Sequence, residues 1–156
     1  MDGACLQWNG NVNSIALPNC FPGGVGVAAS LPSEVSVLTA LTRLDLTGNK
    51  LSPNSGLPAD YSALTGLRLV GLASMDLEAG PVPSSGFPQE WSSLVDLQQL
   101  DLSNNRLLGG TIPASWDILA SVTALNIANT AACGDIPPTL SNSTTPSTLD
   151  SYCGEC

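Results

Sequence analysis

The stretch LQQLDLSNNRLLGGTIPASWDIL, residues 97–119, decides the fold. It holds apolar residues spaced as LxxLxL, then an Asn and a Leu two positions apart, then a Gly-Gly-Thr-Ile-Pro turn and a closing Trp and Leu. Side chains of a strand alternate with a period of two, so Leu100 and Leu102 are predicted to face inward and Asp101 outward. The column positions are Leu97, Leu100, Leu102, Asn105, Leu107, Trp116 and Leu119.

The same columns occur five times along the chain, which predicts a stack of repeats. The units start at residues 12, 41, 67, 97 and 122 and end at 140, so successive starts are 29, 26, 30 and 25 residues apart. The length varies between the Asn column and the Ile-Pro column, and insertions of this kind belong in surface loops. Because one coil cannot sustain a sheet alone, stacked coils are expected to place their strands side by side in a parallel sheet.

The Asn column predicts a ladder of buried amides where the chain turns off the sheet. Asn49 and Asn105 occupy this column, and their side chains can bond backbone groups that the turn leaves unpaired. Cys20, Met75 and Thr130 stand there in the other repeats. We therefore expect an interrupted ladder and a somewhat irregular solenoid.

A proline follows the Ile column in each repeat, and an aromatic residue follows three of these prolines. Proline fixes an extended backbone and rules out a long continuous helix at this place. We expect one short helical or 3₁₀ turn there, which carries Tyr61, Trp91 and Trp116 inward. The rings could form a ligand platform, but an inward column is more typical of core packing.

With these columns in view, the chain resembles the plant-type extracellular leucine-rich repeat family. The similarity is densest in residues 39–51, 94–119 and 132–140, and it covers residues 12–140. Members of that family are extracellular receptor ectodomains, inhibitors of secreted enzymes, or cell-surface and wall proteins. The resemblance implies that the protein recognises a partner on its concave face.

The resemblance also implies the architecture: an α/β solenoid, a right-handed superhelix with a parallel sheet of short strands on the concave face and about five repeats. We expect residues 1–156 to form a single domain, with residues 1–11 and 141–156 as caps at the two ends. Residues 59–64 and 88–94 further resemble surface repeat proteins of green algae and trypanosomatid parasites.

Five cysteines lie in two groups near the ends of the chain, and their spacing favours disulfides over a metal site. Cys5 with Cys20 would close the front of the solenoid. Cys133 with either Cys153 or Cys156 would fold the tail over the last repeat. One cysteine of the five is left over, which indicates a missing continuation or an intermolecular bond.

The disulfides predict an extracellular or cell-surface protein of the secretory pathway. Asn142 begins the only Asn-x-Ser/Thr sequon, and glycosylation there would fit the same setting. No signal peptide is visible after Met1, so we expect the sequence to start at the mature or expressed form.

Charge and hydropathy exclude two classes of partner. The net charge is −9, and the four basic residues are spread along the chain. Nucleic acids and anionic membrane surfaces attract clustered Lys and Arg, so neither is an expected partner. No apolar run is long enough to cross a bilayer, so we expect no membrane insertion by this segment.

The outward side of the sheet is the candidate partner-binding surface. Its side chains are small or polar, with few of the Trp, Tyr and Arg residues that dominate interfaces, so they could equally be plain solvated positions. The partner would be a protein, with or without glycans. The predicted contact residues are Arg43, Asp45, Thr47, Gln99, Asp101, Ser103 and Asn126.

Catalysis is not expected, and neither a cofactor nor a metal is. The chain has no His, which removes the commonest general base, and it has neither a GxSxG nor a phosphate-loop motif. Asp45 and Asp101 share one column and formally resemble a glycosidase pair, but exposed Asp on a repeat ladder is typical of plain surface. Two further interpretations stay open: a structural or assembly subunit of a wall, coat or appendage, and a secreted enzyme inhibitor.

Overall fold

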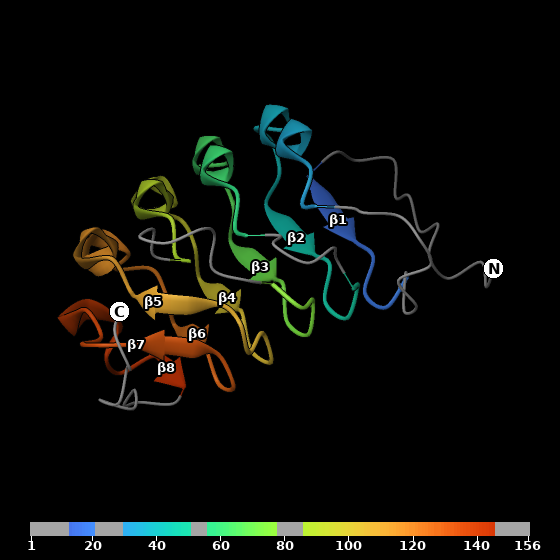
Figure 1. Cartoon of the computed structure of the whole chain (residues 1–156). Coiled ribbons are helices and arrows are strands. Elements are labelled where there is room, and N and C mark those ends of the chain that lie inside the picture. Colours follow the sequence, from blue (N-terminus) through green and yellow to red (C-terminus); the bar gives the residue numbers. More distant parts are fainter. Residues whose placement is uncertain (1–12, 21–29, 51–55, 78–85, 146–156) are drawn as a thin grey trace.

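Six short parallel strands form one sheet. Each of the five repeats adds one strand, and the sixth follows the last repeat. The computed structural model describes residues 13–20, 30–50, 56–77 and 86–145 (Figure 1). The order β1-β2-β3-β4-β6-β8 follows the chain, and the central residues Ile15, Leu44, Val70, Leu100 and Leu125 lie in register. The strands are β1 (Ser14–Ala16), β2 (Arg43–Asp45), β3 (Leu69–Gly71), β4 (Gln99–Asp101), β6 (Ala124–Asn126) and β8 (Thr144–Thr145).

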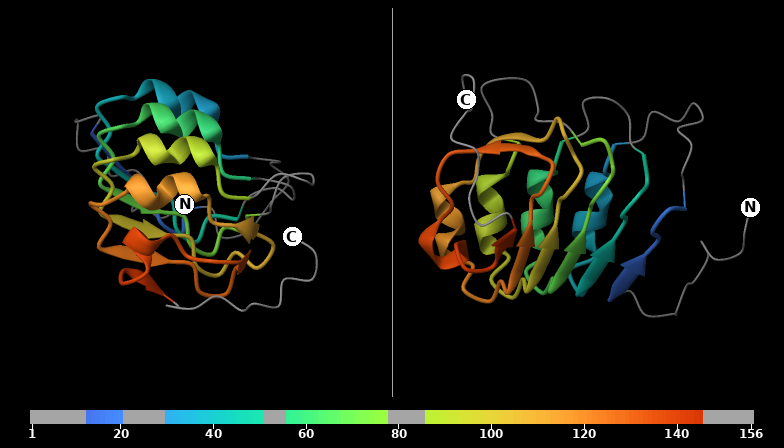
Figure 2. Two further views of the ribbon diagram at one scale, coloured as in Figure 1. Left: turned by 90° about the vertical axis from the view of Figure 1, so that its left-hand side faces the viewer. Right: turned by 90° about the horizontal axis from the view of Figure 1, so that it is seen from below.

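Five short helices form a second layer along the outer side of the stack (Figures 1 and 2). Each begins directly after a proline or, in η6, at the second of two prolines, and every helix in the described ranges is 3₁₀. The preceding prolines have φ between −49° and −72° with extended ψ, which explains why the helices start where they do. The helices are η2 (Ser33–Val37), η3 (Ala59–Ala63), η4 (Gln89–Ser93), η5 (Ala114–Ile118) and η6 (Pro138–Leu140).

The core lies between the sheet and the helices and is made almost wholly of the leucine columns. Leu41, Leu44, Leu64, Leu67 and Leu72 are fully buried, as are their counterparts in later repeats. This arrangement confirms the leucine-rich repeat solenoid with a parallel sheet that the sequence predicts. None of the helices in the described parts is long and apolar enough to cross a membrane.

The aromatic column forms a continuous stack inside this core. The rings of Tyr61 and Trp91 lie 6.4 Å apart between centroids and those of Trp91 and Trp116 lie 6.2 Å apart, with planes 8° and 5° from parallel. All three side chains are 1% exposed, so the prediction that short turns carry them inward is confirmed.

Each ring also donates a hydrogen bond to the preceding repeat, which the sequence pattern does not reveal. The Tyr61 hydroxyl donates to the Pro32 carbonyl (3.1 Å), and the Trp91 indole N–H donates to the Pro58 carbonyl (2.8 Å). The indole N–H of Trp116 donates to Pro88 in the same way (2.9 Å). The rings therefore link repeats through polar contacts as well as through packing.

Asn105 holds the turn of the fourth repeat and reaches into the third. Its amide nitrogen donates to the carbonyls of Leu72 and Leu102, both at 2.8 Å. Its carbonyl oxygen accepts the backbone N–H groups of Met75 (3.0 Å) and Leu77 (3.1 Å). One buried amide thus satisfies four backbone groups in two repeats.

Asn49 also links two repeats, whereas Thr130 bonds only its own repeat. Asn49 Nδ2 donates to the carbonyl of Leu17 in the preceding repeat and to that of Leu46, both at 2.7 Å. Thr130 Oγ1 donates to the Ile127 carbonyl (2.7 Å), which is the bond that the Asn side chains make three residues back, and it accepts the Ala132 N–H (3.3 Å). The hydroxyl thus replaces the amide within its own turn, and its bonds do not reach the preceding repeat, in keeping with the predicted interruption of the ladder.

The residue before the Asn column adopts the left-handed backbone conformation in every repeat. The five φ values run from 55° to 76°, and such values favour Gly, Asn and Asp. In the second repeat, a Cβ atom on Gly48 would collide with the Asn19 side chain of the preceding repeat, so a larger residue there would have to displace Asn19. The five residues are Asn19, Gly48, Ser74, Asn104 and Asn129.

Residues 105–111 differ from the prediction. Leu107, predicted as a core column, is 62% exposed, and Leu108 is fully buried instead. The Leu108 N–H donates to the Asn105 carbonyl (3.0 Å), and this tight turn shifts the column by one residue. The chain then enters β5 (Gly109–Thr111), which pairs in parallel with β7 (Ala131–Cys133) in a second sheet that the columns do not predict.

The end of the stack also extends beyond the last predicted repeat. β8, from residues assigned to the C-terminal cap, adds to β6 as a sixth strand of the main sheet. The Thr144 hydroxyl donates to the Leu140 carbonyl (2.6 Å) and is buried there, which fixes the turn before β8.

Of the predicted disulfide residues, Cys20 and Cys133 fall within the described ranges, and neither is a free thiol there. Cys5, Cys153 and Cys156 lie outside the described residues, as does the predicted N-terminal cap.

Tyr61 makes the fold sensitive to alkaline pH. Burial, together with the nearby Glu34 carboxylate, raises the pKa of Tyr61 well above its ordinary value of about 10. Because the folded pKa exceeds the unfolded one, this stabilisation is complete below pH ~10 and is lost as the pH rises above it, by about 1.4 kcal/mol per pH unit. We predict that Tyr61→Phe removes this part of the decline in unfolding free energy, measured by urea denaturation at several pH values. Parallel declines in both proteins would contradict the prediction.

Candidate partner-binding surface

The outward side chains of four neighbouring strands surround a shallow hollow of about 350 Å³. We call it the concave hollow, because it lies on the inner side of the stack, where the strands are seen side by side in Figure 2. Leu69 and Gly71 of β3 lie between polar residues of β2 on one side and of β4 and β6 on the other. Its lining is Arg43, Asp45, Thr47, Leu69, Val70, Gly71, Gln99, Leu100, Asp101, Ala124 and Asn126.

Gly71 has no side chain, and this affects how the neighbouring side chains line the hollow. A Cβ atom at this position would lie 2.8 Å from Asp45 Oδ1 and 3.0 Å from Thr47 Oγ1. Any other residue would therefore displace these side chains and fill the space between Asp45 and Asp101, which share the register Asp45↔Gly71↔Asp101. Glycine therefore lets the Asp45 and Thr47 side chains lie over the centre of the sheet, where Gly71 itself is buried.

The acidic and amide side chains of this surface also stabilise the strand ends. Asp101 Oδ1 accepts the Ser103 N–H (3.0 Å), and Asp45 Oδ1 accepts the Thr47 N–H (3.3 Å). Asn126 Oδ1 repeats the contact with the backbone N–H two residues on, at 3.2 Å. Asp or Asn recurs in this column because its side-chain oxygen accepts a backbone N–H at the end of the strand. One oxygen of each carboxylate is left for other partners.

Arg43 is partly held by its own strand. Its guanidinium Nη2 lies 2.9 Å from Asp45 Oδ2, and the two side chains are 44% and 18% exposed. An exposed pair of this kind contributes little to stability, about 0–1 kcal/mol. The pair does place a charged donor at the rim of the hollow in a defined position.

Six of the seven predicted contact residues come together here, and Ser103 does not. Ser103 is 6% exposed, and the neighbouring Asn104 amide lies 3.4 Å from its hydroxyl, so its side chain belongs to the turn. Leu69 and Gly71 line the hollow although they are not among the predicted contact residues. Aligning LRLVGL with the LxxLxL columns identifies both.

Asp45 and Asp101, the two carboxylates of one column, do not stand on neighbouring strands. Each carboxylate is bonded to the backbone of its own repeat, and a third strand separates them. Within the described ranges, no group of three or more Cys, Asp or Glu side chains is placed to hold a metal ion.

The comparisons with known proteins agree with this fold. The Leucine Rich Repeat family profile matches residues 96–118, the stretch that defines the columns. No curated protein sequence matches the chain. Among solved structures, the ectodomain of the Arabidopsis receptor kinase HAESA, with a peptide hormone ligand, is 31% identical, with a TM-score of 0.61. That match covers 73% of this chain and 18% of HAESA.

Two further structures show the range of proteins that share the fold. The ectodomain of the receptor kinase GASSHO1/SCHENGEN3 from Arabidopsis thaliana is 28% identical (TM-score 0.61; 72% of this chain, 12% of that one). A plant ice-binding protein is 24% identical (TM-score 0.61; 84% of this chain, 38% of that one) and shows the fold alone. The chain thus spans under a fifth of the two receptor ectodomains. It has the leucine-rich repeat fold, and its similarity to algal and trypanosomatid surface proteins stays a prediction.

Substitutions of Asp101 test whether the carboxylates of this column stabilise the fold. Asp101→Asn keeps an oxygen that can accept the Ser103 N–H, whereas Asp101→Ala removes the acceptor and leaves a backbone donor unpaired. We predict an unfolding free energy within about 0.5 kcal/mol of wild type for Asn and a loss of about 1 kcal/mol for Ala. Urea denaturation followed by circular dichroism measures both, and equal stability of the two variants would contradict the structural role.

Proposed function

We propose that the chain is a protein-interaction module that holds an extended segment of a protein partner on its concave sheet face. The observation that supports this most is the concave hollow itself. It joins one half-buried apolar residue, Leu69, to exposed polar side chains on both sides, Arg43 and Gln99. Apolar contact at the centre with polar groups at the rim is typical of recognition sites.

The stability of the sheet also suits such a role. The ends of β2, β4 and β6 are each bonded by their own Asp or Asn side chain, and neighbouring repeats are tied by aromatic donors and buried amides. A rigid surface loses little conformational entropy when it binds. The partner would therefore meet contact residues that are already in place.

The solved structures of similar fold support a binding role by analogy. HAESA is described in complex with the peptide hormone IDA and the co-receptor SERK1, and GASSHO1/SCHENGEN3 in complex with CASPARIAN STRIP INTEGRITY FACTOR 2. Since this chain spans only a small part of those ectodomains, we carry over the kind of function and not the ligand. We propose a binding role without catalysis.

We further propose that the module works outside the cell, as part of a larger receptor, adhesion or surface protein. Cys20 and Cys133 are not free thiols, which fits disulfide-closed ends in an oxidising compartment. Asn142 is exposed in the turn before β8, so a glycan on its side chain would point into solvent. Both features support a secretory origin.

The test is to block the concave hollow and leave the rest intact. Leu69→Arg would place a long cation over the centre of the concave hollow. The matched control is Val37→Arg, because Val37 is 74% exposed at the end of η2 on the outer side. Peptides would be selected from a random displayed library against the full wild-type chain and then measured by fluorescence anisotropy.

We expect the selected peptides to bind Leu69→Arg at least about tenfold more weakly than wild type, a change of about 1.4 kcal/mol. Val37→Arg should bind them like wild type. Undiminished binding to Leu69→Arg, with the fold intact by circular dichroism, would show that the concave face is not the recognition surface.

A further inference from the structure

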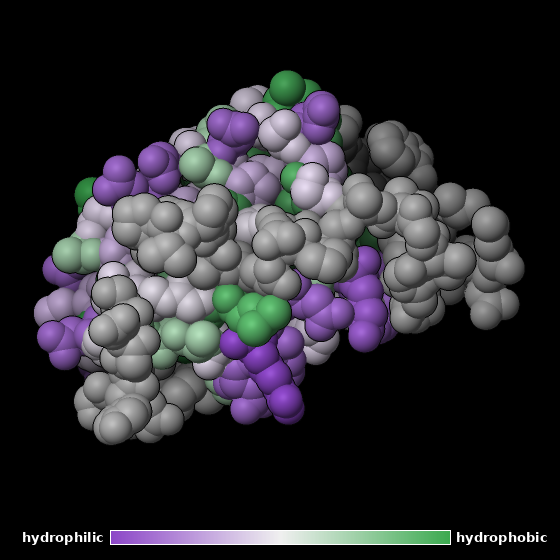
Figure 3. Space-filling view, viewed as in Figure 1, coloured by the Kyte–Doolittle hydropathy of each residue, from purple (hydrophilic) through white to green (hydrophobic). Residues whose placement is uncertain are grey.

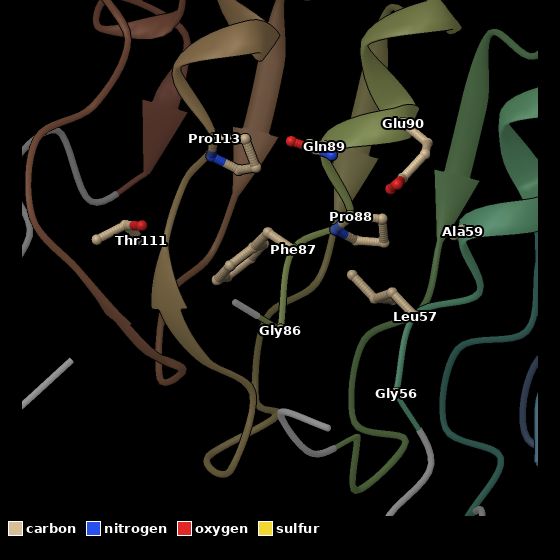
Figure 4. A pocket seen from close by; sticks show the side chains of 10 residues that line it. All are labelled: Gly56, Leu57, Ala59, Gly86, Phe87, Pro88, Gln89, Glu90, Thr111 and Pro113. Carbon is tan, nitrogen blue, oxygen red and sulfur yellow. The ribbon is translucent and has the colours of Figure 1, made fainter. Parts of the chain in front are cut away.

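A second surface runs along the side of the solenoid, between the second sheet and the 3₁₀ helices. It consists of two hollows of about 510 Å³ and about 450 Å³ that share Thr111 and Pro113 as a common wall. In the first, Phe87 and Pro88 lie between Leu57 on one side and the shared wall on the other (Figure 4). We call the two hollows together the lateral groove.

The floor of the lateral groove repeats from one unit to the next. The Ile-Pro columns of successive repeats supply it, with Pro88 and Pro113 in the first hollow and Pro113 and Pro137 in the second. Pro88 is also the acceptor of the Trp116 indole N–H, so the floor is tied to the aromatic stack beneath it. The floor of the first hollow is therefore held at a fixed place relative to that stack.

Its rim carries negative charge only, among the residues that the structure describes. Glu90 lines the first hollow, and Asp117 and Asp135 line the second, without a Lys or Arg in either. The Thr139 N–H donates to Asp117 Oδ1 (2.8 Å) and lowers the pKa of that carboxyl, which keeps it ionised. In Figure 3, hydrophilic side chains lie over the 3₁₀ helices, interspersed with apolar ones.

The basic residues of the protein all lie elsewhere. They stand in or beside the strands and the turns that follow them, and the two ion pairs in the described ranges, Arg43–Asp45 and Lys50–Asp76, form there. The carboxylates of the lateral groove thus have no cation of their own in the described parts of the chain. The four basic residues are Arg43, Lys50, Arg68 and Arg106.

The spacing of the repeats matches that of an extended peptide. The rings under the groove are 6.2–6.4 Å apart, and two residues of an extended chain span about 6.6 Å. A peptide lying along the solenoid axis would therefore place every second side chain on the equivalent position of the next repeat. Its remaining side chains would face away from the floor, and only long ones, such as those of Lys or Arg, would reach back to the carboxylates of the rim.

We propose that the lateral groove binds an extended peptide segment in which apolar and basic residues alternate. The apolar side chains would pack on the proline floor, and the basic ones would pair with Glu90, Asp117 and Asp135. This surface is separate from the concave hollow, so the inference does not rest on the function proposed above.

The probe is a fluorescein-labelled octapeptide of alternating Val and Lys, measured by anisotropy against the full chain. A block octapeptide with four Val followed by four Lys has the same composition and charge without the alternation. The groove variant is Glu90→Gln, Asp117→Asn, Asp135→Asn. The matched control, Glu34→Gln, Asp76→Asn, Asp96→Asn, removes the same charge from exposed positions outside the groove.

We expect the alternating peptide to bind wild type at least about tenfold more tightly than the block peptide. The groove variant should bind the alternating peptide about tenfold more weakly than wild type, and the control variant should keep most of the wild-type affinity. Ala114→Lys, which adds one cation to the groove wall, should lose affinity as well and serves if the triple variant does not fold. Leu69→Arg should bind the peptide like wild type.

Three results would each overturn the proposal. Equal affinity for the alternating and block peptides would remove the spacing argument. An equal loss in the groove and control variants would mean that only the net charge of −9 attracts the peptide. Loss of binding in Leu69→Arg would place the peptide in the concave hollow.

Discussion

The hydrogen bond from an aromatic ring of one repeat to a proline carbonyl of the preceding repeat is the constraint on which the rest of the structure depends. The donors of Tyr61, Trp91 and Trp116 each reach the proline that starts the 3₁₀ helix one repeat back. Proline itself has no N–H, and its carbonyl already accepts the N–H of its own helical turn in each of these repeats. The ring supplies a second donor and fixes the distance between repeats on the helix side.

Both candidate surfaces follow from that constraint. On the strand side, equal stacking keeps Arg43, Leu69 and Gln99 in register, so outward residues from successive repeats line one hollow. On the helix side, the same stacking sets the Ile-Pro columns at the spacing of alternate residues in an extended chain. A solenoid held by packing alone would keep neither spacing as strictly, because apolar contacts have no preferred direction.

Much of the fold could be predicted from the columns, because burial of one leucine in each turn leaves a visible period. The strands, the 3₁₀ turns and the inward rings all follow from it. The period of the leucines does not predict the backbone conformation of the turns, because hydrogen bonds determine it. Leu107 faces solvent because the bond from Leu108 to Asn105 tightens the turn, and the Thr130 hydroxyl makes the bond within its turn that an Asn makes in other repeats.

The candidate site was less predictable. The alternating pattern predicts which face of the sheet a side chain lies on, but not how exposed that side chain is. Ser103 lies on the predicted side and is still buried in its turn, whereas Leu69 is apolar and half exposed. The second sheet could not be predicted either, since Gly109–Thr111 and Ala131–Cys133 are small residues without an alternating pattern. Backbone pairing alone forms it.

The central claim is that the ring donors, and not only the rings, hold the repeats together. The most direct measurement replaces Trp91 by benzothienylalanine, which keeps the shape of the indole and removes its N–H donor, and compares unfolding free energies in urea. We predict a loss of about 0.5–1.5 kcal/mol, the usual net contribution of one hydrogen bond. An unfolding free energy equal to that of wild type would contradict the claim and show that ring packing, strand pairing and the buried amides link the repeats without the ring donors.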